Sequence, residues 1–171
     1  MTHAQEPVDS PVDWVAEHTR QYVATDGAEG HLWHGVPTLL LTTIGRRSGQ
    51  PRRTALIYGR DDDRYLVVAS KGGAAERPLW YANLCTQPEV EVQVGAERFR
   101  AQARTASPAE KPRLWQQMAQ IWPPYDAYQT KRICQNSEHS PAKQHWSGQK
   151  CRTTFEIEPL LAAVLEHIIG D

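Results

Sequence analysis

The feature that most constrains the fold of this chain is a series of short apolar segments separated by tight polar turns. Residues 38–44 (TLLLTTI) form an almost wholly apolar run, which is typical of a strand buried on both faces. Four further segments have strand character, and the last two alternate apolar and polar residues: 54–58, 64–70, 90–94 and 99–103. Short strands with short connections predict a small antiparallel barrel or an open sheet.

Helical segments flank and interrupt these strands. Residues 11–24 and 78–84 carry helical patterns. In residues 107–121, Ser107 and Glu110 have the spacing of a capping box, and apolar residues then recur at helical intervals. The fold class predicted from the pattern is therefore α+β, mainly β.

The length of 171 residues fits one domain. We expect an N-terminal helix and loop over 11–36, a core over 37–128, and a basic tail over 129–171. Within that tail, 155–157 predicts a short strand and 159–169 a terminal amphipathic helix.

Composition narrows the class of protein. The net charge of −1 excludes the broad basic field of a general nucleic-acid binder, and 40% hydrophobic residues suffice for a core. Three widely spaced cysteines, Cys85, Cys134 and Cys151, indicate neither a disulfide framework nor a zinc ribbon. With no secretory leader or apolar run of membrane-spanning length, we expect a soluble cytoplasmic protein.

The first candidate site is the arginine-rich stretch 44–60 (IGRRSGQPRRTALIYGR). It contains five arginines and no acidic residue. Glycines and a proline shape a loop between two strands, and guanidinium groups, the Ser48 hydroxyl and free backbone N–H groups bind phosphate or carboxylate. Neither a Walker motif nor a dinucleotide fingerprint is present. Taken alone, the stretch is equally compatible with a solvated basic turn.

The second candidate is 69–84 (ASKGGAAERPLWYANL). Paired glycines after a strand allow a flat ligand to approach the backbone, and Lys71 adds a cation there. Trp80 and Tyr81 offer flat apolar surface, and Asn83 offers both a donor and an acceptor. A glycine turn followed by a core-packing helix fits the same residues.

The third candidate is 122–128 (WPPYDAY), where Tyr125 and Tyr128 could cover a cleft and direct phenol O–H groups at a carbonyl or nitro oxygen. Aromatic packing at a helix end is the competing interpretation. Cys134, His139, His145 and Cys151 are zinc-compatible but lack closely spaced pairs, so we expect no metal site. The motifs of serine hydrolases, zincins and zinc deaminases are absent from the sequence.

Four stretches, in this order and spacing, resemble the deazaflavin (F420)-dependent nitroreductase family: LLLTTIGRRSGQPRRTALIYG, YLVVASKGGAAERPLWYANL, PEVEVQV and WPPYDAYQ. The resemblance covers about residues 12–129. It implies a split β-barrel and the cofactor F420, a deazaflavin with a phosphodiester and an oligoglutamate tail.

The resemblance also implies a division of roles within one site. Residues matching the loop that holds the anionic tail are Arg46, Arg47, Ser48 and Arg52, and Arg53 beside them is a further expected cofactor contact. Those matching the segments along the deazaflavin are Thr54, Ala55, Leu56, Ile57, Val68, Ala69, Ser70, Lys71, Gly72, Leu79, Trp80, Tyr81, Ala82 and Asn83. Tyr125 closes the pocket, and Ser70, Tyr125 and Tyr128 lie near the second substrate.

The implied reaction is hydride transfer from the reduced deazaflavin to an electron-poor acceptor such as a quinone, nitro compound or activated alkene. The cofactor carries the difficult chemistry, while the protein orients the reactants and excludes water. No obligatory acid–base residue is evident, and Tyr125 is the expected hydrogen-bond donor.

After residue 129 the chain departs from the family pattern, which continues into a final barrel strand. Either 153–158 (TTFEIE) supplies that strand after an insertion, or the tail is foreign and leaves a barrel edge unpaired.

Three other functions stay open from sequence: an FMN-dependent split-barrel reductase, a non-catalytic deazaflavin or small-molecule binder, and, last, a nucleic-acid contact. We expect no nucleic-acid partner, at most a minor peripheral contact with a membrane through the N-terminal helix, and no inferable oligomeric state.

Overall fold

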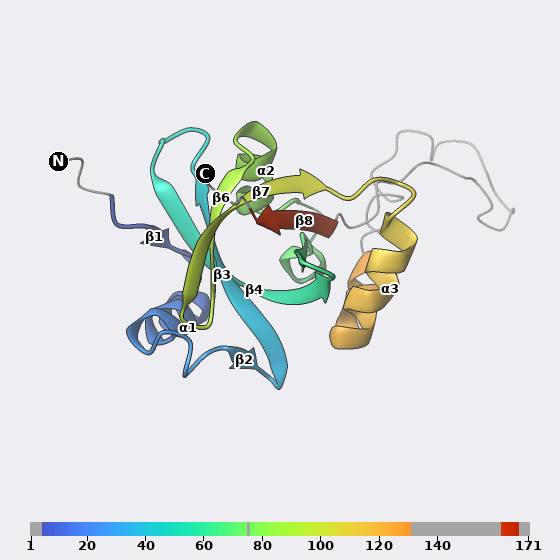
Figure 1. Ribbon diagram of the computed structural model, residues 1–171, viewed down its shortest axis with the longest axis horizontal. Helices are drawn as coiled ribbons and strands as arrows, with labels where there is room; N and C mark the ends of the chain where they lie inside the picture. Colours follow the sequence, from blue (N-terminus) through green and yellow to red (C-terminus); the bar gives the residue numbers. More distant parts are fainter. Residues whose placement is uncertain (1–4, 75, 131–161, 168–171) are drawn as a thin grey trace, which may run out of the picture.

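A computed structural model describes residues 5–74, 76–130 and 162–167. Its centre is a ring of six strands in which every neighbouring pair is antiparallel (Figure 1). In ring order these strands are β3 (Val36–Ile44), β4 (Pro51–Asp61), β5 (Arg64–Val68), β8 (Ala162–His167), β7 (Glu97–Thr105) and β6 (Glu89–Val94). Because β6 pairs again with β3, the sheet closes into a barrel, one of the two architectures that the strand pattern left open and the one that the family resemblance implied.

Two short strands extend this sheet outside the ring. β1 (Val8–Asp9) pairs in parallel with β4, and β2 (Leu32–Trp33) pairs with the beginning of β3. β1 fixes the segment before α1 to the barrel wall, and β2 fixes the segment after it.

The helices lie around the barrel. α1 spans Asp13–Ala24, α2 spans Leu79–Thr86 and α3 spans Lys111–Ile121, close to the ranges predicted. Residues 124–130 are also helical, and η1 (Lys71–Gly73) is a single 3-10 turn after β5. The predicted capping box is present, since Glu110 N–H donates to Ser107 Oγ at 3.3 Å and Ser107 N–H donates to the Glu110 carboxylate at 3.0 Å.

The apolar core has two parts, one inside the barrel and one beneath α3. Leu39 and Leu41 of β3 are fully buried in the interior cluster. Leu114 and Met118 of α3 pack in the second cluster, against the outer face of the barrel. Leu40, on the opposite face of β3, is 1% exposed, so the centre of the run 38–44 is buried on both faces, as its composition predicted.

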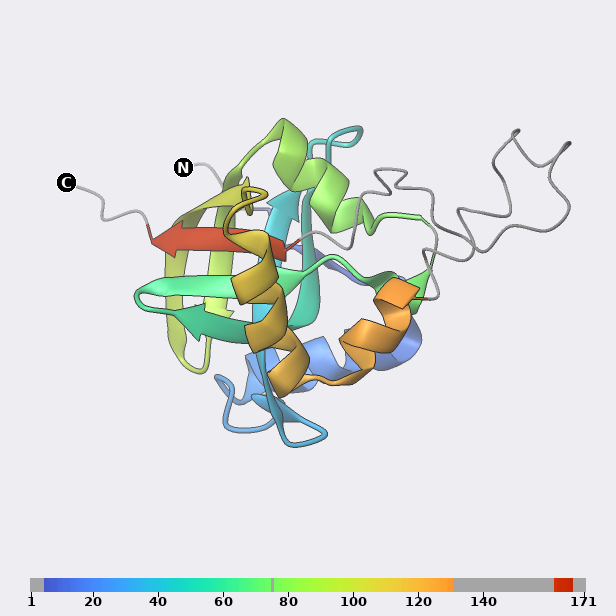
Figure 2. The ribbon, with the colours of Figure 1, turned by 90° about the vertical axis from the view of Figure 1, so that its right-hand side faces the viewer.

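β8 corrects two predictions about the tail. The helix predicted over 159–169 is wrong for the described residues, because Ala162–His167 is a strand. It lies between β5 and β7, with Leu66 opposite Val164 and Ala103 opposite Leu165 (Figure 2). The tail thus supplies the closing strand, but from these residues; the segment 153–158 lies outside the described part of the chain.

Tyr22 fixes the end of α1 to the barrel. Its side chain is fully buried, and its hydroxyl donates to the Thr38 carbonyl at 3.1 Å and accepts from Gly95 N–H at 2.8 Å. These bonds join α1 to β3 and to the β6–β7 turn, so one face of α1 forms a fixed wall beside the barrel.

Candidate functional site

A cavity of about 940 Å³ lies beside the barrel, at the upper end of the range usual for ligand sites. Its lining comes from the turn 45–48, β4, the end of β5, η1, the beginning of α2, the N-terminal segment with α1, single residues of β2 and β3, and the aromatic segment after α3. The turn between β3 and β4 (residues 45–50, the arginine turn) and the Lys-Gly-Gly bend (residues 71–73) therefore face the same cavity, although they are separated in the sequence.

Most of the residues predicted for the site line this cavity. They are Arg46, Arg47, Ser48, Arg52, Arg53, Thr54, Ala55, Leu56, Ile57, Val68, Ser70, Lys71, Gly72, Leu79, Trp80, Asn83, Tyr125 and Tyr128. Three predicted residues do not: Ala69, Tyr81 and Ala82. Tyr81 instead belongs to the barrel core, where its hydroxyl lies 2.7 Å from Thr105 Oγ1.

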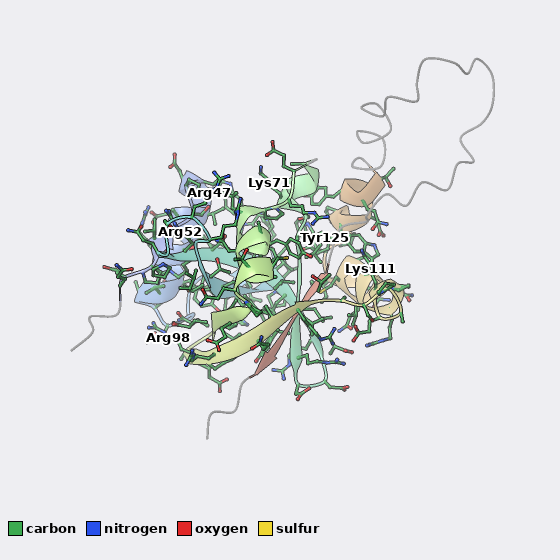
Figure 3. The ribbon with its side chains drawn as sticks, turned by 90° about the horizontal axis from the view of Figure 1, so that it is seen from above. Arg47, Arg52, Lys71, Arg98, Lys111 and Tyr125 are labelled. Atoms are coloured by element: carbon green, nitrogen blue, oxygen red, sulfur yellow. The ribbon has the colours of Figure 1, made fainter. Side chains whose placement is uncertain are left out.

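One end of the cavity is cationic. Arg46, Arg47 and Arg52 are exposed, and no acidic side chain within the described ranges pairs with them. Arg53 is paired with Asp9 at 2.8 Å, and Lys71 with Glu76 at 2.8 Å. In Figure 3, Arg47 and Arg52 lie toward one side of the molecule and Tyr125 toward the other, with Lys71 between them. Three uncompensated guanidinium groups suit a ligand with several negative charges.

Asn83 anchors the arginine turn rather than standing free for a ligand. Its Oδ1 accepts from Arg46 N–H at 3.2 Å, and its Nδ2 donates to Thr43 Oγ1 at 3.1 Å. The turn is also closed on itself, because Gly45 N–H donates to the Gln50 carbonyl at 2.8 Å and Gly49 N–H to the Gly45 carbonyl at 2.7 Å. The backbone of the turn is thereby held before any ligand binds.

The two glycines after Lys71 have different roles. Both have positive φ, 63° at Gly72 and 82° at Gly73, which favours glycine. A Cβ at Gly73 would lie 3.1 Å from Tyr128, whereas one at Gly72 would meet nothing within 4 Å. Gly73 therefore permits Tyr128 to pack closely, and Gly72 leaves the backbone open beside the cavity.

The other end of the cavity is aromatic. Trp33 of β2 stacks on Trp14 of α1, with ring centroids 5.5 Å apart and planes 18° apart, and its centroid lies 5.2 Å from that of Trp122. Tyr125 is 4% exposed and packs between Trp115 and Tyr128. Burial raises the pKa of Tyr125 well above its usual value, so its phenol stays protonated and can donate a hydrogen bond.

Part of this wall was not predicted from the sequence, although Trp122 lies within the third candidate stretch, 122–128. Trp14, Trp33 and Trp122 come from three separate elements, and His18 lies one turn after Trp14 along α1. Burial lowers the pKa of His18, partly offset by a hydrogen bond with the Gly30 backbone, and its buried Nε2 has no partner among the described residues. For Trp14 and Trp33, the one signal available in the sequence was the surplus of tryptophan, six residues in the chain.

The described part of the chain meets the requirements neither of a metal site nor of a membrane-spanning helix. Within residues 5–74, 76–130 and 162–167 there is no group of three or more His, Cys, Asp or Glu side chains placed to hold a metal ion. The four zinc-compatible residues weighed from sequence lie outside those ranges. In the same ranges, none of the helices has both the length and the apolar character needed to cross a bilayer.

A closed antiparallel barrel with a large cavity at its side, cationic at one end and aromatic at the other, defines the class of protein as a split barrel with a lateral ligand site. The family model of the F420H(2)-dependent quinone reductases matches residues 14–133, and the chain belongs to that family. It is therefore an oxidoreductase that uses F420H2, which confirms the predicted family, fold, cofactor and enzyme class.

Individual relatives agree with this assignment. The F420H(2)-dependent quinone reductase Rv1261c of Mycobacterium tuberculosis is 47% identical over 102 residues, 58% of this chain and 68% of the relative. The solved structure of an F420-H2 dependent reductase (FDR-A) has a TM-score of 0.57 at 28% identity, covering 76% of this chain and 94% of its own. A domain-swapped dimer has a TM-score of 0.59 at 30% identity, covering 92% and 100%.

Proposed function

We propose that this protein reduces quinones by binding F420H2 in the cavity described above, with the anionic tail at the arginine turn and the quinone at the aromatic end. The observation that carries the proposal is the division of one cavity into two ends: three guanidinium groups without an acidic partner among the described residues, and a tryptophan–tyrosine wall. Nitro compounds and activated alkenes are alternative acceptors to be assayed beside quinones.

The residues present fit the cofactor. Its phosphodiester and glutamate tail need several cations at once, which Arg46, Arg47 and Arg52 provide. Its flat ring needs an apolar slot, and the β4 segment 54–57 together with Val68 supplies one. Gly72 leaves room for the backbone to approach the ligand. When bound and reduced, the deazaflavin supplies the hydride.

The chain's own residues then act on the acceptor. The tryptophans give the flat quinone apolar surface and exclude water, which strengthens hydrogen bonds made inside the cavity. Tyr125, protonated because burial raises its pKa, donates a hydrogen bond to the quinone oxygen, on which negative charge develops. Ser70, at the end of β5, lies on the same lining and offers a second hydroxyl.

Titration of the purified protein with oxidised F420 and with FMN, followed by fluorescence, tests the cofactor assignment. We expect tight binding of F420, and binding of FMN alone would contradict it. Steady-state oxidation of F420H2 with menadione then tests the reaction, and a nitroimidazole serves as the alternative acceptor.

A pair of arginine variants tests the placement of the tail. Arg47→Gln should weaken F420 binding about tenfold and reduce its dependence on salt, because one ionic contact is lost. Arg98→Gln is the matched control: Arg98 is exposed, pairs with Asp26 and does not line the cavity (Figure 3). Equal effects of both variants would indicate only a change in overall charge.

A further inference from the structure

The segment before α1 lies across the arginine-bearing part of the cavity wall. Val8 and Asp9 form β1, which pairs in parallel with Arg52 and Arg53 of β4. Asp9 Oδ1 accepts a hydrogen bond from Arg53 Nε at 2.8 Å, and both side chains are less than one-fifth exposed, 19% and 16% respectively. A short strand and a shielded ion pair therefore fix this segment at the same two residues.

This contact leaves the ligand-binding edge of Arg53 open. A guanidinium group is planar, so a carboxylate that holds Nε also sets the direction of the two terminal amino groups. Those amino groups have no partner among the described residues, and neither is sealed from solvent. Two parallel N–H groups in such a fork match the oxygens of a phosphate or a carboxylate.

The other cations of the cavity are held less firmly. Lys71 is paired with Glu76, but the two side chains are 47% and 82% exposed, so solvent weakens that pair. Arg46, Arg47 and Arg52 are exposed and have no acidic partner within the described part of the chain. Arg53 thus differs from these four in being shielded and fixed in orientation before a ligand arrives.

We propose that Asp9 is a positioning residue for the anionic part of the cofactor: its hydrogen bond to Nε holds the Arg53 fork toward the cavity. The inference rests on the proposed function and adds a residue of the cavity lining that acts through Arg53. Because the hydrogen bond does the positioning, an amide in place of the carboxylate keeps the effect, although the charge is lost.

The test compares Asp9→Ala with Asp9→Asn in fluorescence titrations of two probes, oxidised F420 and the deazaflavin riboside that lacks phosphodiester and glutamates. Asp9→Ala should weaken F420 binding about tenfold, as expected for one lost charge-assisted contact. It should leave riboside binding unchanged, and Asp9→Asn should restore F420 binding. Asp13→Ala, which removes an exposed carboxylate outside the cavity lining, is the control for charge.

Arg53→Met completes a double-mutant cycle. If Asp9 acts through Arg53, Asp9→Ala adds no further loss in the Arg53→Met background. Unchanged or tighter binding by Asp9→Ala, an equal loss with the riboside, an equal loss in Asp9→Asn, or a loss that persists beside Arg53→Met would each overturn the inference. Wild-type protein that fails to bind F420 would instead overturn the proposed function, and this inference with it.

Discussion

The side-chain oxygen of Asn83 accepts a hydrogen bond from the backbone N–H of Arg46 at 3.2 Å, joining α2 to the first residue of the arginine turn. The same amide donates to Thr43 near the end of β3, so one buried side chain links α2 to both β3 and the turn that follows it. The position of the cationic end of the cavity therefore depends on a residue that carries no charge.

Replacing Asn83 should separate the turn from α2. Asn83→Leu leaves two polar partners without their hydrogen bonds, and we expect a loss of about 1–3 kcal/mol in the free energy of unfolding. We also expect weaker F420 binding, because the backbone that carries Arg46 and Arg47 loses its hydrogen bond to α2. Denaturant unfolding and fluorescence titration measure the two effects. Gln87→Ala, which removes an exposed amide just after α2, should change neither.

Removing the Tyr125 hydroxyl should slow reduction of the acceptor and leave cofactor binding unchanged. Tyr125→Phe is expected to lower kcat/KM for menadione about tenfold, the value of one hydrogen bond, with unchanged F420 binding. Because burial raises the pKa of Tyr125, its phenol remains a donor throughout the neutral and moderately alkaline range. The wild-type rate should therefore show no loss from tyrosine ionisation between about pH 7 and 9.5.

Tyr58→Phe supplies the control for that measurement. Tyr58 is also a buried tyrosine whose pKa burial raises, but it lies outside the lining of the large cavity. An equal loss of activity in this variant would argue against a specific role for the Tyr125 hydroxyl.

Glu110 makes stability depend on pH. Two hydrogen bonds from Arg104, at 2.9 Å each, and further bonds from Ser107 hold the pKa of Glu110 far below its usual value. The ionised carboxylate therefore stabilises the fold above the unfolded pKa of about 4.3, and this contribution is lost as pH falls toward the folded pKa. Glu110→Gln should lower Tm by several degrees at pH 7, and the difference from wild type should shrink at pH 3.

Glu89→Gln tests whether loss of an exposed surface ion pair produces the same pH-dependent change in Tm. Glu89 pairs with Arg100 at 3.0 Å, but both side chains are more than half exposed. Exposed pairs contribute little, so its Tm difference from wild type should be small at both pH values. A Tm difference in Glu110→Gln that stays constant with pH would contradict the assignment to the carboxylate.

β8 should be necessary for the closed barrel. Leu165 is fully buried inside the barrel, and Leu165→Ala should cost about 2–5 kcal/mol in the free energy of unfolding. Leu32→Ala removes the same atoms from a side chain that is 63% exposed and should cost far less. If the two variants unfold at the same denaturant concentration, β8 does not close the barrel in solution.

The barrel strands could be predicted because each carries its own local pattern. β8 could not, because two consecutive residues are buried on opposite sides of the sheet: Leu165 faces the barrel interior and Val164 packs beneath α3. Such a strand has no alternation and is not distinguishable by period from a buried helix. Its identity depends on β5 and β7, which are distant in sequence.

The cavity, too, was only partly predictable from local sequence patterns. The arginine turn was predictable because five cations without an acid in one short stretch are informative by themselves. The aromatic wall was not, because Trp14, Trp33 and Trp122 meet only after α1, β2 and the end of α3 are placed. Likewise, nothing local indicates that the Asn83 amide would support the turn.

The late position of β8 in the chain has a consequence for how the barrel forms. Leu66 pairs with Val164, on the order of a hundred positions further along, and contacts between such distant residues are slow to form. Until that pairing is made, β5 and β7 each present an unpaired backbone edge to other chains. Premature association during synthesis or refolding should therefore begin at these two edges, and a peptide spanning β8, added in excess, should suppress it.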